Sequence, residues 1–130
     1  MAELETQMFV LDQHDLAELS PAGRLVTVRV EIPPHNAGTP PHRHPGPLYG
    51  YMVEGEMLFE LEGDPPRVIR AGETFWEPGG DRIHYVAAND TDASARFVVM
   101  MTCGPGQELL TFVDANELVA RRHLRHPSAV

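Results

Sequence analysis

The stretch PPHRHPG, residues 40–46, holds two histidines in a segment with too many prolines for a helix. Residues two apart in an extended chain point to the same side, so the imidazoles of His42 and His44 can approach one ion. A third histidine, His84, follows the turn Pro78-Gly79-Gly80 in a predicted strand that could bring it to the same point. Neutral imidazole binds Fe, Ni, Cu, Zn or Mn, and three imidazoles leave coordination positions open for substrate or water.

His42, His44 and His84 are therefore predicted to bind one divalent metal ion. The alternative interpretation is a solvated His-Arg-His loop and a core histidine that bonds to a backbone carbonyl. We favour the metal site because the pair and the distant histidine both lie in predicted strands with turn glycines beside them. The other four histidines lie in polar or terminal contexts and are assigned no role.

Alternating apolar residues around these histidines indicate β-strands. In LVTVRVEI, residues 25–32, valine or isoleucine at every second position predicts a strand with one buried face. A hairpin is expected from residues 48–53 and 57–62, which flank the turn signal Glu54-Gly55-Glu56. Short strands with frequent turns favour an all-β sandwich or barrel. The remaining predicted strands are residues 67–70, 74–77, 83–88 and 95–103.

The length of the chain indicates a single domain. A chain of 130 residues can bury roughly two-thirds of its unfolded surface around one core. We therefore predict one domain over residues 1–130, with a barrel core at about 24–113. Asp114 followed by Glu117 fits a capping box, which predicts a short C-terminal helix at about 115–124.

The charge balance excludes several partners and chemistries. Ten Arg, no Lys and 19 acidic residues give a net charge of -9, which repels nucleic acid and anionic membrane surfaces. Without lysine the chain cannot form a Schiff base, and its single cysteine, Cys103, cannot form an internal disulfide. The first residues lack the pattern of a signal peptide, and no apolar run approaches the roughly 20 residues of a membrane span. We therefore expect a cytoplasmic protein.

Two motifs between about Pro33 and Asn89 resemble the motif pair of the cupin superfamily, G-x5-H-x-H-x3,4-E-x6-G and G-x5-P-x-G-x2-H-x3-N. The resemblance implies an antiparallel double-stranded β-helix, the jelly-roll cupin barrel, with one divalent metal inside. It also implies a homodimer. The first motif is carried by His42, His44 and Gly55, with Asn36 where the family has glycine. The second is carried by Gly72, Pro78, Gly80, His84 and Asn89, with one extra residue before the histidine.

The glutamate ligand of the first cupin motif is missing from its expected position. The spacing places Leu48 there, and the longer permitted spacing places Tyr49 there. Since Leu48 shares a face with His42 and His44, a three-His centre is expected, with Tyr49 or water as a possible fourth ligand. Such centres are similar to those of the diketone-cleaving and thiol dioxygenases among cupins. Fe(II) is therefore favoured as the cofactor, with Ni, Mn or Zn as alternatives.

The alternation of side chains along the predicted strands also predicts which residues line a pocket inside the barrel. Apolar lining residues would select a small, largely apolar or aromatic substrate. Tyr49, Tyr51 and Arg82 are weaker catalytic candidates, and Arg43 and Arg82 could hold a substrate carboxylate. Packing for the tyrosines and solvation for the arginines are the alternatives. The predicted lining residues are Leu48, Phe59, Leu61, Phe97, Val99 and Met101.

The sequence therefore favours a metal-dependent small-molecule enzyme, a three-His non-haem iron dioxygenase acting on a small apolar or aromatic substrate that chelates the metal. No motif prepares a Ser, Cys or Lys nucleophile, so the metal would carry the chemistry. The alternatives are a metal-dependent isomerase, cyclase or lyase, and a non-catalytic ligand-binding or sensor cupin. The missing glutamate favours the sensor, whereas the three histidines favour the enzyme.

Overall fold

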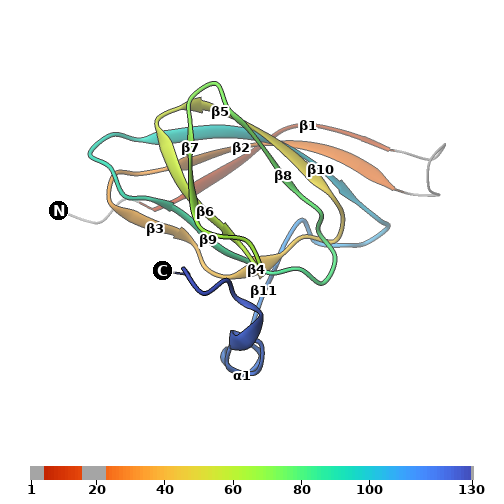
Figure 1. Cartoon of the computed structure of the whole chain (residues 1–130). Helices are drawn as coiled ribbons and strands as arrows, with labels where there is room; N and C mark the ends of the chain where they lie inside the picture. The colour runs from red at the N-terminus through yellow and green to blue at the C-terminus, as the bar shows by residue number, and fades with distance from the viewer. Residues whose placement is uncertain (1–4, 16–22, 130) are drawn as a thin grey trace.

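Two antiparallel β-sheets pack face to face in the computed structural model, which describes residues 5–15 and 23–129 (Figure 1). The all-β prediction is confirmed. The first sheet contains, in spatial order, β1 (Gln7–Asp15), β2 (Arg24–Ile32), β10 (Ala95–Cys103), β5 (Leu48–Glu54) and β8 (Thr74–Glu77).

The second sheet carries the segments that contain the predicted histidines. Its strands follow each other as β11 (Thr111–Phe112), β4 (His42–Arg43), β9 (His84–Asn89), β6 (Glu56–Leu61) and β7 (Arg67–Arg70). A further strand, β3 (Asn36–Thr39), also pairs with β9.

The strands predicted from alternation agree with the structure to within one residue at each end. The sequence analysis missed β1, which lies before the predicted core and pairs along β2. Its sequence, QMFVLDQHD, lacks the regular alternation of apolar and polar residues that identified the other strands. It also missed β3, whose sequence NAGT shows no alternation of apolar and polar residues, and β11, which has two residues. β4 lies in the extended segment predicted to carry His42 and His44.

The predicted hairpin of β5 and β6 is wrong. β5 pairs with β10 and β8 in the first sheet, whereas β6 pairs with β7 and β9 in the second. Gly55 connects them at a φ of 76°, where a Cβ would lie 2.5 Å from the carbonyl oxygen of Ser94. The turn therefore carries the chain from one sheet to the other, so both strands bury one face in the same core.

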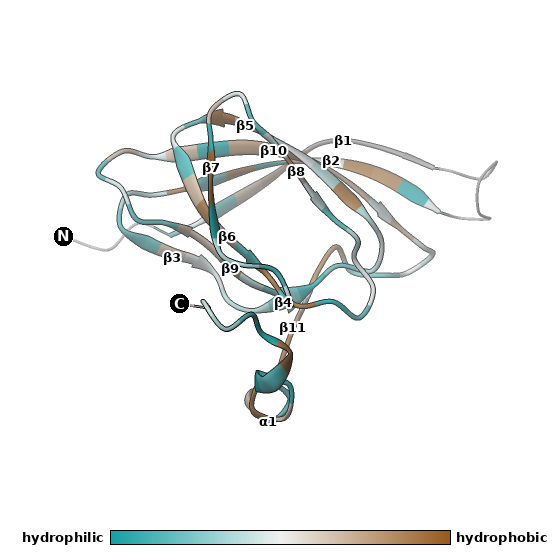
Figure 2. Cartoon of the chain, in the orientation of Figure 1, coloured by the Kyte–Doolittle hydropathy of each residue, from teal (hydrophilic) through white to brown (hydrophobic). Residues whose placement is uncertain are grey.

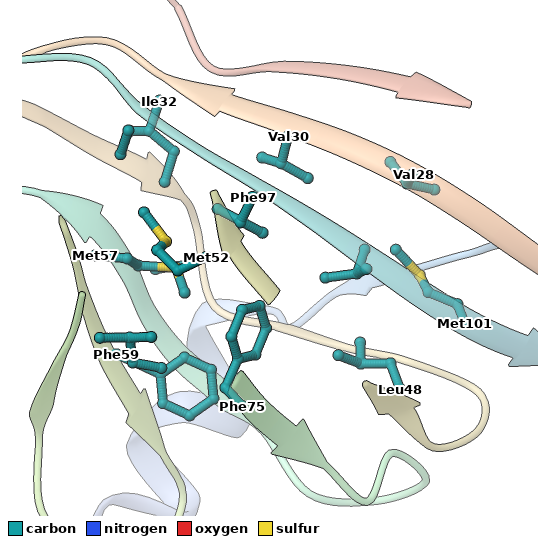
Figure 3. Packing of buried hydrophobic residues seen from close by; sticks show 14 of the residues in the cluster. Val28, Val30, Ile32, Leu48, Met52, Met57, Phe59, Phe75, Phe97 and Met101 are labelled. Carbon is teal, nitrogen blue, oxygen red and sulfur yellow. The ribbon is translucent and has the colours of Figure 1, made fainter. Parts of the chain in front are cut away.

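The core lies between the two sheets and is built by strand alternation. Along β2 and β10 every second side chain is buried, and the hydropathy colours alternate accordingly along several strands (Figure 2). The ring of Phe75 lies between those of Phe59 and Phe97, with centroids 5.4 and 5.5 Å away (Figure 3). Gly50 makes room for it, because a Cβ there would lie 2.0 Å from the Phe75 ring. Each such buried apolar side chain stabilises the fold by about 1.5–3 kcal/mol.

The C-terminal segment lies outside the barrel, next to β4 and β11 (Figure 1). The predicted helix at 115–124 is divided into an α-helix, α1 (Ala115–Ala120), and a 3₁₀ helix, η1 (Arg122–Leu124). The predicted cap is confirmed, since the Asp114 carboxylate accepts from the backbone N–H of Glu117 at 2.8 Å. In the described part of the chain, no helix has the length and apolar character needed to cross a bilayer.

Candidate metal centre

The three histidines predicted from the sequence come together between the sheets. β4 pairs with β9 so that His42 lies opposite His84, and their ring centroids are 4.9 Å apart. His44 follows β4, and its ring lies 4.8 Å from that of His42. The backbone N–H of Gly80 donates to the carbonyl of His44 at 2.8 Å, which ties the turn before His84 to the first pair. All three side chains are buried.

A fourth polar side chain, Glu77 at the end of β8, joins the histidines from the opposite sheet. Its Oε1 atom lies 3.0 Å from Nδ1 of His84 and 3.7 Å from Nε2 of His44. One ligand atom from each of His42, His44, Glu77 and His84 can be chosen so that all four lie within 4.8 Å of one another. This buried cluster could bind a metal ion. It corrects the expectation of a three-His centre without a carboxylate.

The position of Glu77 explains why the motif search missed it. Leu48 occupies the position of the family's glutamate, and its register partner across the β5–β8 pair is Glu77. The carboxylate is therefore supplied by the neighbouring strand. A signal was present in the sequence, because alternation places Glu77 on the same buried face of β8 as Phe75. A carboxylate on a core-facing position is rare unless it has a partner.

Backbone carbonyls orient all three imidazole rings. Nδ1 of His42 donates to the carbonyl of Pro40 at 2.8 Å, and Nδ1 of His44 donates to that of Leu109 at 2.9 Å. Nε2 of His84 donates to the carbonyl of Val86 at 2.8 Å. Because a carbonyl only accepts, each of these nitrogens carries a proton. The other nitrogen of each ring points into the cluster and, when unprotonated, can act as a metal ligand.

These acceptor nitrogens lack suitable partners within the described residues. Nε2 of His42 and Nε2 of His44 are 3.1 Å apart, although neither has a proton to donate in the neutral rings. Nδ1 of His84 is buried without a hydrogen bond, beside the carboxylate of Glu77. Converging lone pairs and a carboxylate repel one another unless a proton or a metal cation lies between them. The residues present therefore fit a divalent metal ion.

Burial keeps the site in this ligand form. Desolvation, together with the neighbouring His84 and His44 rings, lowers the pKa of His42 to about 4. Burial also lowers the pKa of His44. For Glu77, burial raises the pKa, but the charge and hydrogen-bond interactions with His84, and the charge of His44, outweigh burial and hold the pKa below its ordinary value. At neutral pH His42 and His44 are thus neutral and Glu77 is ionised, which are the forms that bind a metal.

The metal-free chain is expected to lose stability as the pH falls from about 6.5 to about 4. Since the pKa of His42 is lowered in the folded state, the unfolded chain takes up the proton first, and acidification favours unfolding. The free energy of unfolding should fall by about 3 kcal/mol across this window. Urea unfolding in the presence of a chelator at several pH values measures this fall. His42→Gln should remove most of it, and an equal fall in that variant would contradict the assignment.

A narrow, mostly apolar cavity of about 30 Å³ adjoins the four polar side chains. Apart from those four, Thr39 is the one polar residue in its lining. Of the predicted lining residues, Phe59 and Leu61 do not line the cavity but pack in the core. The ring centroids of Phe59 and His84 are 4.6 Å apart. The predicted residues that do line the cavity are Leu48, Phe97, Val99 and Met101.

The weaker catalytic candidates lie away from this cavity. Tyr49 and Tyr51 are 44% and 47% exposed, because alternation along β5 turns them to the outer face when Leu48 faces inward. Arg82 donates to the backbone carbonyl of Glu62 and pairs with Asp64. Arg43 likewise points outward and pairs with Glu117. None of the four lines the cavity beside the histidines.

Comparison with known proteins agrees with this fold and site. The family model described as "Cupin domain" matches residues 28–101. A solved oxalate oxidase is similar over 83% of this chain and 55% of its own, at 30% sequence identity and a TM-score of 0.60. The chain thus spans about half the length of that oxidase.

Two further solved structures extend the comparison. The DMSP lyase DddQ from Ruegeria pomeroyi is similar over 68% of this chain and 43% of its own, at 26% identity and a TM-score of 0.55. A double-stranded β-helix protein from Klebsiella pneumoniae, at 16% identity and a TM-score of 0.64, covers 88% of this chain and 89% of its own and shows the fold alone. No curated protein sequence matches the chain. The family match over most of the barrel, together with the two-sheet fold, shows that the chain belongs to the cupin family.

Proposed function

We propose that this cupin is a metal-dependent enzyme that acts on a small molecule within the barrel, and that its reaction is an oxygen-dependent oxidation. The observation that carries the proposal is the convergence of three oriented imidazoles and one carboxylate beside an apolar cavity. His42, His44, His84 and Glu77 would hold the metal. Iron is proposed first and manganese second, because imidazoles suit iron and the added carboxylate also suits manganese.

The protein's own residues would orient and shield the centre. When bound, the metal would supply Lewis acidity and, if redox-active, a path for electrons to oxygen. The carbonyls of Pro40, Leu109 and Val86 hold the rings in the tautomers that ligation requires. The apolar walls exclude water, which strengthens electrostatic interactions at the site.

The cavity limits the substrate class. Its volume of about 30 Å³ has room for roughly two water-sized groups. A small chelating group fits this space, whereas a larger substrate requires the lining side chains to move. Three of these are the flexible methionines Met8, Met57 and Met101, which adapt readily to a ligand. Among the described residues, no arginine lines the cavity, so a second, uncoordinated carboxylate on the substrate would lack a partner there.

An oxidation is favoured over an elimination by the composition of the lining. A lyase or isomerase needs a side chain to take up a proton, and the described lining offers only Thr39 besides the proposed ligands. The similarity to an oxalate oxidase at 30% identity supports the same choice. Lyase chemistry is the second candidate, supported by the similarity to a DMSP lyase at 26% identity. The sensor hypothesis loses its main support, because Glu77 supplies a carboxylate.

Oxygen consumption by the metal-loaded protein tests the proposal. Protein loaded anaerobically with Fe(II), or with Mn(II), is mixed with β-diketones, flavonols, thiols and oxalate in an oxygen electrode. We expect uptake with at least one substrate and a loss of about 100-fold or more in His84→Ala, since that variant lacks a proposed ligand. Bound metal without oxygen uptake across this panel would reject the oxidation and leave the lyase as the remaining candidate.

A further inference from the structure

Arg43 lies between the two histidines of the first motif but faces away from them. Alternation turns His42 and His44 toward the interior and Arg43 outward. Its Nε donates to the backbone carbonyl of Asp81 at 2.9 Å, and its Nη2 lies 3.4 Å from the Asp81 carboxylate. The same Nη2 donates to the carboxylate of Glu117 in α1. Arg43 therefore joins the strand that carries His42 to the turn that precedes His84, and joins both to the C-terminal helix.

Arg121, at the end of α1, binds the same turn from the other side. Its Nη1 donates to the Asp81 carboxylate at 2.8 Å, and its Nε donates to the buried carboxylate of Glu62 at 3.0 Å. The backbone N–H of Glu62 in turn donates to the carbonyl of Ile83, the residue before His84. We call Arg43, Glu62, Asp81, Glu117 and Arg121 the clamp network.

The chain that leads into α1 also touches the candidate ligands directly. The carbonyl of Leu109 accepts from His44, and β11 pairs with β4 so that Phe112 lies opposite His42. The backbone N–H of Val113 donates to the carbonyl of Pro41 at 3.1 Å. No residue of α1 is fully buried, so polar contacts, among them the clamp network, are important in holding this helix against the barrel.

We infer that the clamp network positions the ligands of the metal centre, with Arg43 as its main positioning residue. The inference rests on the proposed function, because it assumes that His42, His44 and His84 bind the metal. The clamp network connects the segments that carry these ligands. In the segment that leads into α1, the carbonyl of Leu109 also fixes the ring of His44. Outer residues that orient metal ligands typically change metal affinity by 10–100-fold when replaced.

Replacement of Arg43 by methionine gives a test in which positioning and electrostatics act in opposite directions. Removing a positive charge near the centre should by itself strengthen the binding of a cation. Loss of positioning should instead weaken it, and we expect the Kd for Mn(II) to rise about tenfold in Arg43→Met. The Kd is measured by isothermal titration. Urea unfolding of the metal-free protein measures separately how far the loss of these part-buried contacts lowers the stability of the fold.

Arg96→Met is the matched control. Arg96 pairs with Glu31 and Glu54 on the outer face of the first sheet, so the variant loses the same charge away from the clamp network. Its Kd should equal that of wild type. Arg43→Lys keeps the charge but loses the geometry of the guanidinium, and it serves if Arg43→Met does not fold. It should also weaken Mn(II) binding, although the charge near the centre is unchanged. Adding Glu117→Gln, at the half-buried carboxylate that pairs with Arg43, should weaken binding less in Arg43→Met than in wild type.

The outcomes separate this inference from the proposed function. An unchanged or lower Kd in Arg43→Met, with wild type binding Mn(II), would overturn the positioning role alone. A wild-type protein that binds neither Mn(II) nor Fe(II) would overturn the proposed function and the positioning role together. A higher Kd in Arg43→Met with an unchanged Kd in Arg96→Met would support the positioning role.

Discussion

Replacement of Glu77 by leucine is expected to weaken metal binding by more than about 100-fold, beyond the effect typical of a residue outside the ligand shell. Among the described residues of the cluster, the substitution removes the carboxylate and leaves the three histidines. The metal-free variant should be less stable than wild type, because Glu77 is one partner of a buried pair with His84, so its fold is checked by circular dichroism before the titration. Metal analysis after purification without a His-tag, and titration with Mn(II), measure the effect.

The register of β5 and β8 provides a rescue experiment for this prediction. Leu48 and Glu77 are direct partners, and both side chains face the cavity. Partners across two antiparallel strands have Cβ atoms about 4.5–5.5 Å apart, so a glutamate at 48 can reach the same region. Leu48→Glu combined with Glu77→Leu should therefore recover much of the lost affinity. Glu77→Gln, which keeps the shape without the charge, should remain weak.

Two results are decisive: the first would contradict the role of Glu77 as a ligand, and the second would contradict the rescue by Leu48→Glu. One is wild-type affinity in Glu77→Leu, which would mean that the histidines alone bind the metal. The other is a double variant that folds but binds no better than Glu77→Leu. In that case the charge alone would not suffice, and the position of the carboxylate on β8 would be essential.

Metal loading is expected to raise the melting temperature of the wild-type chain by roughly 15 °C. A ligand that binds only the folded state at 1,000 times its Kd adds about 4.1 kcal/mol of stability. In a domain of this size each kcal/mol raises the melting temperature by about 4 °C. In His84→Ala the difference between metal-loaded and chelator-treated protein should fall to about 2 °C or less, because a ligand is missing.

The difference in melting temperature between metal-loaded and chelator-treated protein is measured by calorimetry or circular dichroism. Comparing this difference between variants removes the direct effect of each substitution on folding. His123→Ala is the control, since His123 is exposed in η1 and is not part of the cluster. The His123→Ala variant should show the same difference in melting temperature as wild type. A shift in His84→Ala as large as in wild type would exclude His84 as a ligand.

Much of the fold could be predicted from the sequence because its strands bury one face. Val26, Val28, Val30 and Ile32 alternate with polar residues, and alternation of this kind locates a strand without knowledge of its neighbours. The histidines of the site were found for a similar reason, since His42 and His44 are two residues apart on one extended segment. Asp114 and Glu117 identified the start of the helix through a local hydrogen bond. The homodimer and the cytoplasmic location, which were also expected from the sequence, stay predictions.

The tertiary structure alone decided which strands are neighbours and hence which carboxylate joins the site. Gly55 passes the chain between sheets instead of forming a hairpin, and it lies so close to Ser94, which is distant in sequence, that a side chain there would collide with it. Glu77 meets His84 because β8 pairs with β5 and the two sheets face each other. The outward direction of Tyr49 and Tyr51 became clear only with the position of the core. Alternation is a local property that assigns residues to faces, whereas the pairing of strands depends on packing between distant segments.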